Sequence, residues 1–301
     1  MTAYAGEIFA ILSALSFALF NVTVTATSRS RGDKGVLFSV IVTIGFSFAL
    51  FLLFEAGRIS LAYDTSTLLG LGYFAFAGVA AMAFGRTLVF TSIRRLGPTR
   101  ASAVKRLNPF FSVLLAALIL SEPVTAFDMA GLAAIAFAFT VLVSDSLQRA
   151  NRVAVTAGPL AYGIGAAAAL AYAIAYIGRK AGLELLNAPA LGTFVSALAG
   201  FAFFAVVALV SARYRPMFQD VFRNIDRHIF IAALLVSAGQ VLMFAALAYA
   251  SVSTVVMISS LEIFFSIFLS WLVFRTERRP GPRVLISAGL AIVGVLLVAA
   301  G

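Results

Sequence analysis

Long apolar stretches alternate along the chain with short polar runs. Ten stretches of about 18–25 residues are almost free of charge, the length at which a helix crosses about 30 Å of hydrocarbon at about 1.5 Å per residue. Because a backbone in lipid must satisfy its hydrogen bonds internally, each stretch predicts a transmembrane helix. The predicted helices cover residues 5–27, 36–55, 68–92, 98–120, 126–144, 158–178, 189–211, 229–249, 252–274 and 281–300.

The composition agrees with a membrane protein. Of the 301 residues 62% are hydrophobic and 11% are charged, whereas about a quarter of a soluble domain is charged. The chain has no cysteine and one histidine, His228, which excludes disulfides, thiol catalysis and cysteine or histidine metal sites. We therefore expect neither a metal nor a cofactor.

The net charge of +10 comes from basic residues that flank the apolar stretches. Such residues face anionic lipid headgroups, so we expect membrane lipids as partners and no nucleic acid. The sequence also lacks a His-Glu-x-x-His motif, paired intramembrane aspartates and a nucleophile near a histidine. These absences argue against an enzyme.

Four short segments recur in the same order in the second half of the chain. The matches are 85–90 with 239–244 and 108–112 with 262–266 at an offset of 154, 14–18 with 169–173 at 155, and 130–133 with 288–291. A shared order at nearly one offset predicts an internal duplication. We predict two homologous five-helix repeats, residues 1–147 and 148–301, divided at the polar break after the fifth helix.

An odd number of helices per repeat means that the second repeat enters the membrane from the opposite side. The loops after the first, third, fifth, seventh and ninth helices hold sixteen Lys or Arg residues. The loops on the other face hold three, namely Arg58, Arg179 and Lys180. The positive-inside rule then places the basic face in the cytoplasm and predicts that both termini are periplasmic.

Two local patterns add a family resemblance. Gly85-Arg86-Thr87-Leu88 lies near the end of the third helix, and Ile119-Leu120-Ser121-Glu122-Pro123 closes the fourth before Gly131-Leu132. With the two repeats, they make the chain similar to the drug/metabolite transporter superfamily, and most similar to its EamA-type bacterial members, which include amino-acid and metabolite exporters. Phe17 and Tyr172 occupy positions where that pattern commonly has Trp.

The resemblance implies an all-α membrane protein of ten transmembrane helices, arranged as two inverted five-helix repeats around a central cavity. It also implies that the cavity opens alternately to each side and that the fifth and tenth helices are more peripheral.

Four ionisable residues lie inside the predicted helices: Arg86, Lys105, Arg106 and Glu262. Each costs about 2.5–3.5 kcal/mol at a helix centre, so each is a candidate functional residue. A residue close to a helix end can instead extend its charge to the headgroups, which is the alternative for Arg86, Lys105 and above all Arg106. For Glu262 the alternative is a structural ion pair with Lys105 or Arg86.

Polar residues share faces with these charges. Lys105, Asn108 and Ser112 have helical spacing, and their repeat equivalents are Ser259, Glu262 and Ser266. The remaining candidates are polar or aromatic residues of the first, third, sixth and eighth helices. The predicted substrate-binding residues are Arg86, Lys105, Asn108, Gln240, Ser259, Glu262, Phe17, Asn21, Tyr172 and Tyr176.

Three cations against one carboxylate give this set a net positive charge. We expect a substrate with an anionic group held by Arg86 and Lys105, while Glu262 holds an ammonium group, as in an amino acid, or carries a coupling proton. Export of a small polar metabolite is one reading, and a lipid or lipid-carrier flippase of the same fold is the alternative. A non-transporting scaffold is a third reading, which predicts that the buried charges can be neutralised without effect.

Arginine outnumbers lysine by 19 to 3, which is typical of a bacterial, high-GC source and so favours the cell inner membrane. The sequence is compatible with a monomer.

Overall fold

The computed structural model of the protein describes residues 4–27, 34–58, 64–150, 158–211, 215–219, 221–222, 225–273, 275 and 279–300. Over these residues the secondary structure is helical, and none of them forms a strand. The helices, of which η1 and η2 are π-helical, are α1 (Ala5–Thr27), α2 (Lys34–Leu50), η1 (Phe51–Glu55), α3 (Thr65–Val79), η2 (Ala80–Arg86), α4 (Thr87–Leu96), α5 (Pro98–Lys105), α6 (Asn108–Ile119), α7 (Ala126–Ala150), α8 (Pro159–Leu185), α9 (Pro189–Val210), α10 (Arg215–Gln219), α11 (Arg227–Tyr249), α12 (Val252–Ser259), α13 (Glu262–Leu272) and α14 (Pro282–Ala300).

Ten stretches of the described chain are long and apolar enough to cross a membrane. They are Ala5–Val24, Leu37–Glu55, Thr65–Leu96, Arg100–Ile119, Ala126–Asp145, Pro159–Leu185, Pro189–Val210, Arg227–Tyr249, Val252–Leu272 and Pro282–Ala300. The prediction of an all-α protein with ten membrane helices is confirmed. The structure differs from the sequence prediction in the length of the sixth stretch, in breaks within the fourth and ninth, and in the π-helices η1 and η2 of the second and third.

The sixth membrane helix is longer than predicted. From its sequence this helix is predicted to end at residue 178, with Arg179 and Lys180 in the following loop, but α8 continues to Leu185. It ends close to Ala188, whose backbone leaves the helical region (φ −136°, ψ 78°) before Pro189 begins α9. Both cations therefore lie inside a membrane helix, and the loop assignment was wrong.

The fourth and ninth membrane helices are each broken in the middle, which corrects the prediction of continuous helices. In the fourth, Pro109 has no N–H to donate and its ring crowds the preceding turn, so the chain turns at Arg106 and Leu107 between α5 and α6. In the ninth, the hydroxyl of Ser260 donates to the carbonyl of Met257 and so competes with the helical hydrogen bonds. Lys105 and Asn108 therefore belong to different helical segments and do not share one continuous face.

The predicted repeat spacing recurs in these irregular backbone features. α5 and α12 begin 154 residues apart, at Pro98 and Val252, and both are eight residues long. Two non-glycine residues of the described chain have positive φ, Ser121 (54°) and Arg275 (51°), and they too are separated by 154 positions. Since such backbone conformations are uncommon, their shared register indicates that the two repeats also match in their local backbone geometry.

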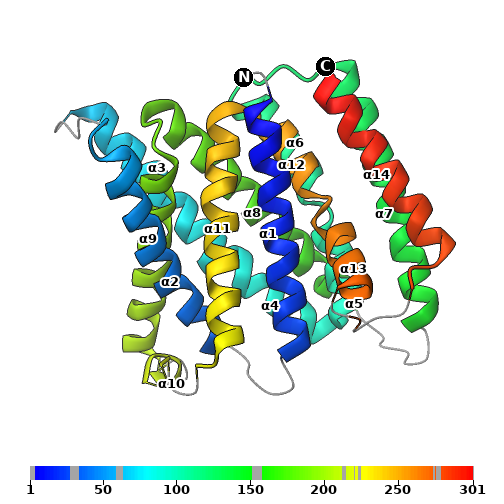
Figure 1. The fold of residues 1–301 in the computed structure, drawn as a ribbon, viewed down its shortest axis with the longest axis horizontal. Coiled ribbons are helices and arrows are strands. Elements are labelled where there is room, and N and C mark those ends of the chain that lie inside the picture. The colour runs from blue at the N-terminus through cyan, green and yellow to red at the C-terminus, as the bar shows by residue number, and fades with distance from the viewer. Residues whose placement is uncertain are drawn as a thin grey trace. The chain divides into compact units, whose positions relative to one another are not determined.

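The chain forms two compact units, and each takes segments from both halves of the sequence. Unit 1 contains Met1–Val79, Gly178–Ala250 and Glu262–Arg278. In it α1 packs along α11, seen as neighbouring blue and yellow helices in Figure 1, and α3 packs on α9. Gly78 makes the α3–α9 approach possible, because a Cβ there would stand 2.1 Å from the backbone oxygen of Ser196. The Ser196 hydroxyl then donates to the carbonyl of Phe74 over 2.7 Å.

Unit 2 contains Ala80–Ile177, Ser251–Leu261 and Arg279–Gly301. Its fifth and tenth membrane helices, α7 and α14, run side by side (green and red in Figure 1). They touch at two glycines: a Cβ at Gly131 would lie 2.6 Å from the oxygen of Gly294, and one at Gly294 would lie 2.8 Å from the oxygen of Gly131. Close backbone approach through small residues is how helices commonly associate in lipid.

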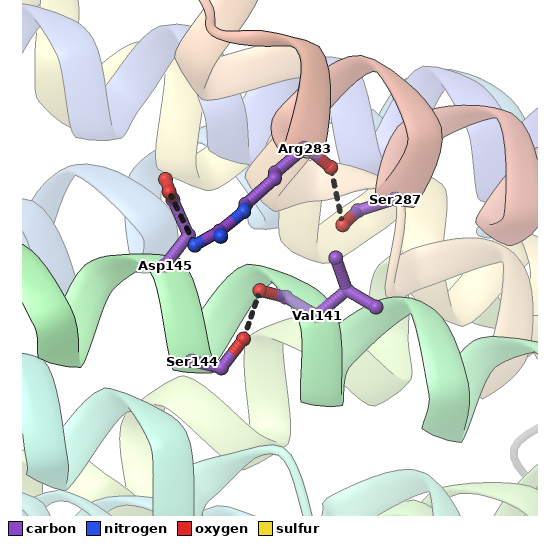
Figure 2. A network of polar contacts seen from close by, with 5 residues as sticks. All are labelled: Val141, Ser144, Asp145, Arg283 and Ser287. Atoms are coloured by element: carbon purple, nitrogen blue, oxygen red, sulfur yellow. Dashed lines mark hydrogen bonds and ion pairs between the residues drawn. The ribbon is translucent and has the colours of Figure 1, made fainter.

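The ends of α7 and α14 are polar. Figure 2 shows Arg283, whose Nη1 lies 3.8 Å from the Oδ1 of Asp145. The hydroxyl of Ser287 donates to the Arg283 carbonyl over 2.8 Å, and that of Ser144 to the Val141 carbonyl over 2.8 Å (Figure 2). The Arg283 side chain is 54% exposed, so this ion pair contributes little to stability.

Charged side chains bind the ends of neighbouring helices within each unit. In unit 1 the Glu55 carboxylate accepts from the backbone N–H groups of Ala190 (2.8 Å) and Leu191 (3.0 Å) at the start of α9. In unit 2 the carboxylate of Glu122 accepts from the N–H of Val252, the first residue of α12, over 2.8 Å. A negative charge at a helix start and unpaired N–H groups satisfy each other.

Lys180 binds the C-terminal end of a helix, where carbonyl groups rather than N–H groups lack partners. Its Nζ donates to the carbonyls of Leu247 (3.0 Å) and Ala250 (3.1 Å), where α11 ends in unit 1. The cation thus interacts favourably with the partial negative charge of the helix C-terminus. Its place inside α8 has a structural explanation.

We predict that Gly294→Ala destabilises the protein, because the added methyl group collides with the backbone of α7. Overpacking of this kind costs about 1–3 kcal/mol. The matched control is Gly289→Ala in the same helix, since a Cβ there meets no heavy atom within 4 Å. Thermal unfolding of both variants in detergent tests this, and equal midpoints would contradict the proposed α7–α14 contact.

Candidate functional site

The acidic candidate, Glu262, lies in unit 1 at the first turn of α13. Its Oε1 accepts a hydrogen bond of 2.6 Å from the side-chain amide of Asn21 on α1. The sequence analysis named both residues and expected an ion pair as the structural alternative for Glu262. An amide can donate to a carboxylate through nitrogen or accept from a carboxyl group through oxygen. The Asn21 contact is therefore compatible with either protonation state of Glu262.

Phe17 and Gln240 lie in the same unit. The Phe17 ring rests on Gly239 of α11, where a Cβ would stand 3.2 Å from three ring carbons. The hydroxyl of Ser13, one turn earlier on α1, donates to the Gly239 carbonyl over 2.8 Å. Gln240 follows Gly239 directly and is half-buried. The α1–α11 contact thus places the Phe17 ring against the residue that precedes Gln240.

Arg86 lies in unit 2 as the last residue of the π-helix η2. A π-helical segment adds a residue to the turn and so changes which side chains share a face, and such segments are frequent at functional sites. The Arg86 side chain is half-buried, and its Nη1 lies 3.7 Å from the sulfur of Met82. The sequence pattern predicted an ordinary helix here and could not predict the π-helical turn.

Lys105 and Tyr172 meet in unit 2. The Lys105 Nζ lies 5.5 Å from the centroid of the Tyr172 ring, a cation–π contact between α5 and α8. Arg106, the next residue, places its guanidinium carbon 5.0 Å from the ring centroid of Phe139 on α7. Because the helix is broken at Arg106, the two neighbouring cations contact different rings.

Three further candidates lie in unit 2. The carboxamide oxygen of Asn108 accepts from the Ser112 hydroxyl over 2.8 Å, within α6. The Ser259 hydroxyl at the end of α12 is buried and has no hydrogen-bond partner among the residues that the structure describes. Tyr176 lies one turn beyond Tyr172 on α8 and is half-buried.

The structure therefore distributes the ten candidates over two polar groups. Unit 1 holds Phe17, Asn21, Gln240 and Glu262, and unit 2 holds Arg86, Lys105, Asn108, Ser259, Tyr172 and Tyr176. The acid belongs to the first group and the cations to the second.

Sequence reasoning missed one buried cation, Arg179. It is 6% exposed in α8 of unit 1, where its Nη1 donates to the sulfur of Met243 over 3.2 Å. Its guanidinium carbon lies 5.2 Å from the ring centroid of Phe244. A signal was available, because Asn187 and Pro189 mark the start of the next helix and no proline lies between Arg179 and Asn187.

Comparison with known proteins gives a family and a fold. The sequence profile of the EamA-like transporter family matches the chain twice, over residues 4–144 and 159–300. No match is found among curated proteins. A solved structure titled "Crystal structure of protein" aligns with a TM-score of 0.73 and 14% sequence identity, covering 97% of this chain and 96% of that one.

At this identity the structural alignment demonstrates a shared fold and nothing finer. The two profile matches together span nearly the whole chain, one in each half. They agree with the repeated backbone features at a spacing of 154 residues. The chain belongs to the EamA-like transporter family and is a multi-pass membrane transporter of the drug/metabolite transporter type.

Proposed function

We propose that the protein exports a small polar metabolite with an anionic group, either an amino acid or an organic anion, by alternating access between two inverted repeats. The observation that carries the proposal is the Asn21–Glu262 hydrogen bond of 2.6 Å inside the membrane, in a chain whose other intramembrane candidates include Arg86 and Lys105. Charged side chains at this depth are costly and mark transport pathways more often than packing sites.

The charges support an anionic substrate. Arg86 and Lys105 are the charged members of the unit 2 group, and both are cations. The Lys105 ammonium group lies over the Tyr172 ring, and an ammonium group binds a carboxylate more strongly than it binds a neutral group. A substrate carboxylate is therefore a stronger partner for Lys105 than this ring.

Glu262 supports either an ammonium group on the substrate or the coupling of transport to a proton. Its carboxylate holds either the ammonium group of an amino acid or a proton that moves with the substrate, and Asn21 can hydrogen-bond to both forms. Transport of an amino acid and proton coupling are thus two versions of one proposal, in which Glu262 changes its partner during each cycle.

We further propose that the protein lies in a bacterial inner membrane with both termini in the periplasm. The argument is the distribution of basic residues, sixteen on one face of the predicted topology. With Arg179 and Lys180 now inside α8, only Arg58 remains among the three cations assigned to the other face.

Replacing Arg86 with Met, Lys105 with Met, or Glu262 with Gln is expected to reduce uptake into proteoliposomes about tenfold or more. A charge-assisted hydrogen bond contributes about 1.5–3 kcal/mol, and a factor of ten corresponds to about 1.4 kcal/mol. Arg58→Gln and Glu184→Gln are matched controls, because both remove an exposed charge outside the two candidate groups. Full transport by all three site variants at equal protein levels would refute the assignment of these residues.

The substrate class is tested by a ligand screen on the purified protein. We expect amino acids or organic acids to raise the unfolding temperature, since a ligand at 100 times its Kd stabilises the bound state by about 2.7 kcal/mol. Lipid phosphates form the comparison set. Stabilisation by lipid phosphates alone would replace the metabolite exporter with a flippase.

The topology is tested by labelling single cysteines, which the cysteine-free chain allows without background. A cysteine added at either end should react with a membrane-impermeant maleimide in intact spheroplasts. Reaction at one end only would mean an odd number of membrane crossings and would overturn the inverted repeats.

A further inference from the structure

One contact between an aromatic ring and a glycine occurs in both units. In unit 1 the Phe17 ring lies against Gly239, where a Cβ would stand 3.2 Å from Cδ1, Cε1 and Cζ. In unit 2 the Tyr172 ring lies against Gly85, where a Cβ would stand 3.0 Å from Cε2. Both distances are shorter than an ordinary carbon–carbon contact, so each ring uses the space that the missing side chain leaves.

The two contacts are related by the internal duplication. Tyr172 follows Phe17 by 155 positions, and Gly239 follows Gly85 by 154. Each contact joins the first helix of one repeat to the third helix of the other. In one contact the ring comes from the first repeat and the glycine from the second, and in the other contact the reverse holds. A packing detail that is present once could be incidental, but this one is present at both equivalent places.

Each ring also lies next to candidate polar residues of its own unit. Gly85 directly precedes Arg86, and the Lys105 ammonium group lies 5.5 Å from the Tyr172 centroid. The Tyr172 ring thus lies between the backbone of Gly85, which precedes Arg86, and the ammonium group of Lys105. A shift of the ring therefore changes its contact with Lys105 or with Gly85 in η2, the π-helix that ends at Arg86.

In unit 1 the Phe17 ring has equivalent neighbours. Gly239 directly precedes Gln240, and Asn21, one turn beyond Phe17 on α1, donates to Glu262 over 2.6 Å. The Asn21–Glu262 contact joins the first and ninth membrane helices, and the Lys105–Tyr172 contact joins the fourth and sixth. These two helix pairs are also equivalent under the duplication.

We propose that the Gly85–Tyr172 and Gly239–Phe17 contacts are specificity determinants: each ring, seated on its glycine, sets the width of the water-filled path beside the polar residues of its unit. The inference rests on the proposed function, since it takes these polar residues to line that path. The rings then limit the substrate to small molecules, and the glycines fix how far each ring reaches.

The test measures width directly and needs no identified substrate. Lys105→Cys places a thiol on the exposed residue whose ammonium group lies 5.5 Å from the centroid of the Tyr172 ring. Its reaction rate is measured with 2-aminoethyl methanethiosulfonate and with a bulky, biotin-bearing methanethiosulfonate. We expect Gly85→Ala to change the ratio of the bulky to the small rate at least threefold. Gly163→Ala on α8 is the control, because a Cβ there meets no heavy atom within 4 Å.

A second variant covers the case in which Gly85→Ala does not fold. Tyr172→Leu removes the ring and leaves the glycine, so the bulky reagent should react at least threefold faster relative to the small one. The double variant of Gly85→Ala and Tyr172→Leu should match Tyr172→Leu alone, because the added methyl group then has no ring to displace. A purely structural contact would change the unfolding temperature and leave the ratio unchanged.

The same experiment applies to unit 1, with Asn21→Cys as the reporter, Gly239→Ala as the variant and Gly45→Ala as the control, since Gly45 also has no heavy atom within 4 Å of an added Cβ. Unchanged ratios in all ring and glycine variants would overturn the inference while leaving the proposed function intact. Absence of any reaction at Lys105→Cys and Asn21→Cys would show that no water reaches the polar groups, and would overturn both.

Discussion

Lipid supplies no hydrogen-bond partners, and this constraint acts on every polar group that lies inside a membrane helix. Within the helices the backbone satisfies itself, but each helix end leaves N–H or carbonyl groups without partners. The structure satisfies several of these with charged side chains from other helices: Glu55 at the start of α9, Glu122 at the start of α12 and Lys180 at the end of α11. Three ionisable residues in a membrane protein thus have a structural explanation before any functional one is needed.

The remaining polar residues inside the membrane stand out against that background. Glu262 contacts an amide, Lys105 a tyrosine ring, and Arg179 a thioether and a phenylalanine ring. None of these contacts caps a helix. Lys105 and Glu262 lie at the breaks of the fourth and ninth membrane helices and Arg86 ends a π-helix, whereas Arg179 lies inside the continuous helix α8. Irregular backbone inside a membrane is costly, so its coincidence with polar side chains favours function over packing.

Much of the fold could be predicted from the sequence because span length and charge distribution are direct consequences of bilayer thickness. The repeat offset of 154 could also be found in the sequence. It made Lys105 equivalent to Ser259 and Asn108 equivalent to Glu262. The helix breaks were harder to predict from the sequence. Pro109 gave a signal for the first, but the second depends on a serine that bonds back to its own helix, a conformation that many intramembrane serines do not adopt.

The candidate contacts were less predictable, because they depend on which helices pack together. Asn21 and Glu262 are 241 positions apart, and only the packing of α1 against α13 brings them into hydrogen-bond distance. Arg179 was misplaced for a simpler reason. Two adjacent cations resemble a loop by composition, yet Lys180 binds the end of α11 and Arg179 lies against an aromatic ring of α11, so both contact the neighbouring helix from within α8.

The matched interruptions of the fourth and ninth membrane helices have a bearing on the history of the gene. Because both copies turn at the same register, the break was already present in the single five-helix ancestor. The copies now maintain it by different chemistry, a proline in one and a serine in the other, so the residues have diverged while the geometry has been kept. The segment thus has the same shape in both repeats although its sequence differs. If the repeats are inverted as proposed, a five-helix ancestor could have formed such a bundle only from two molecules inserted in opposite directions.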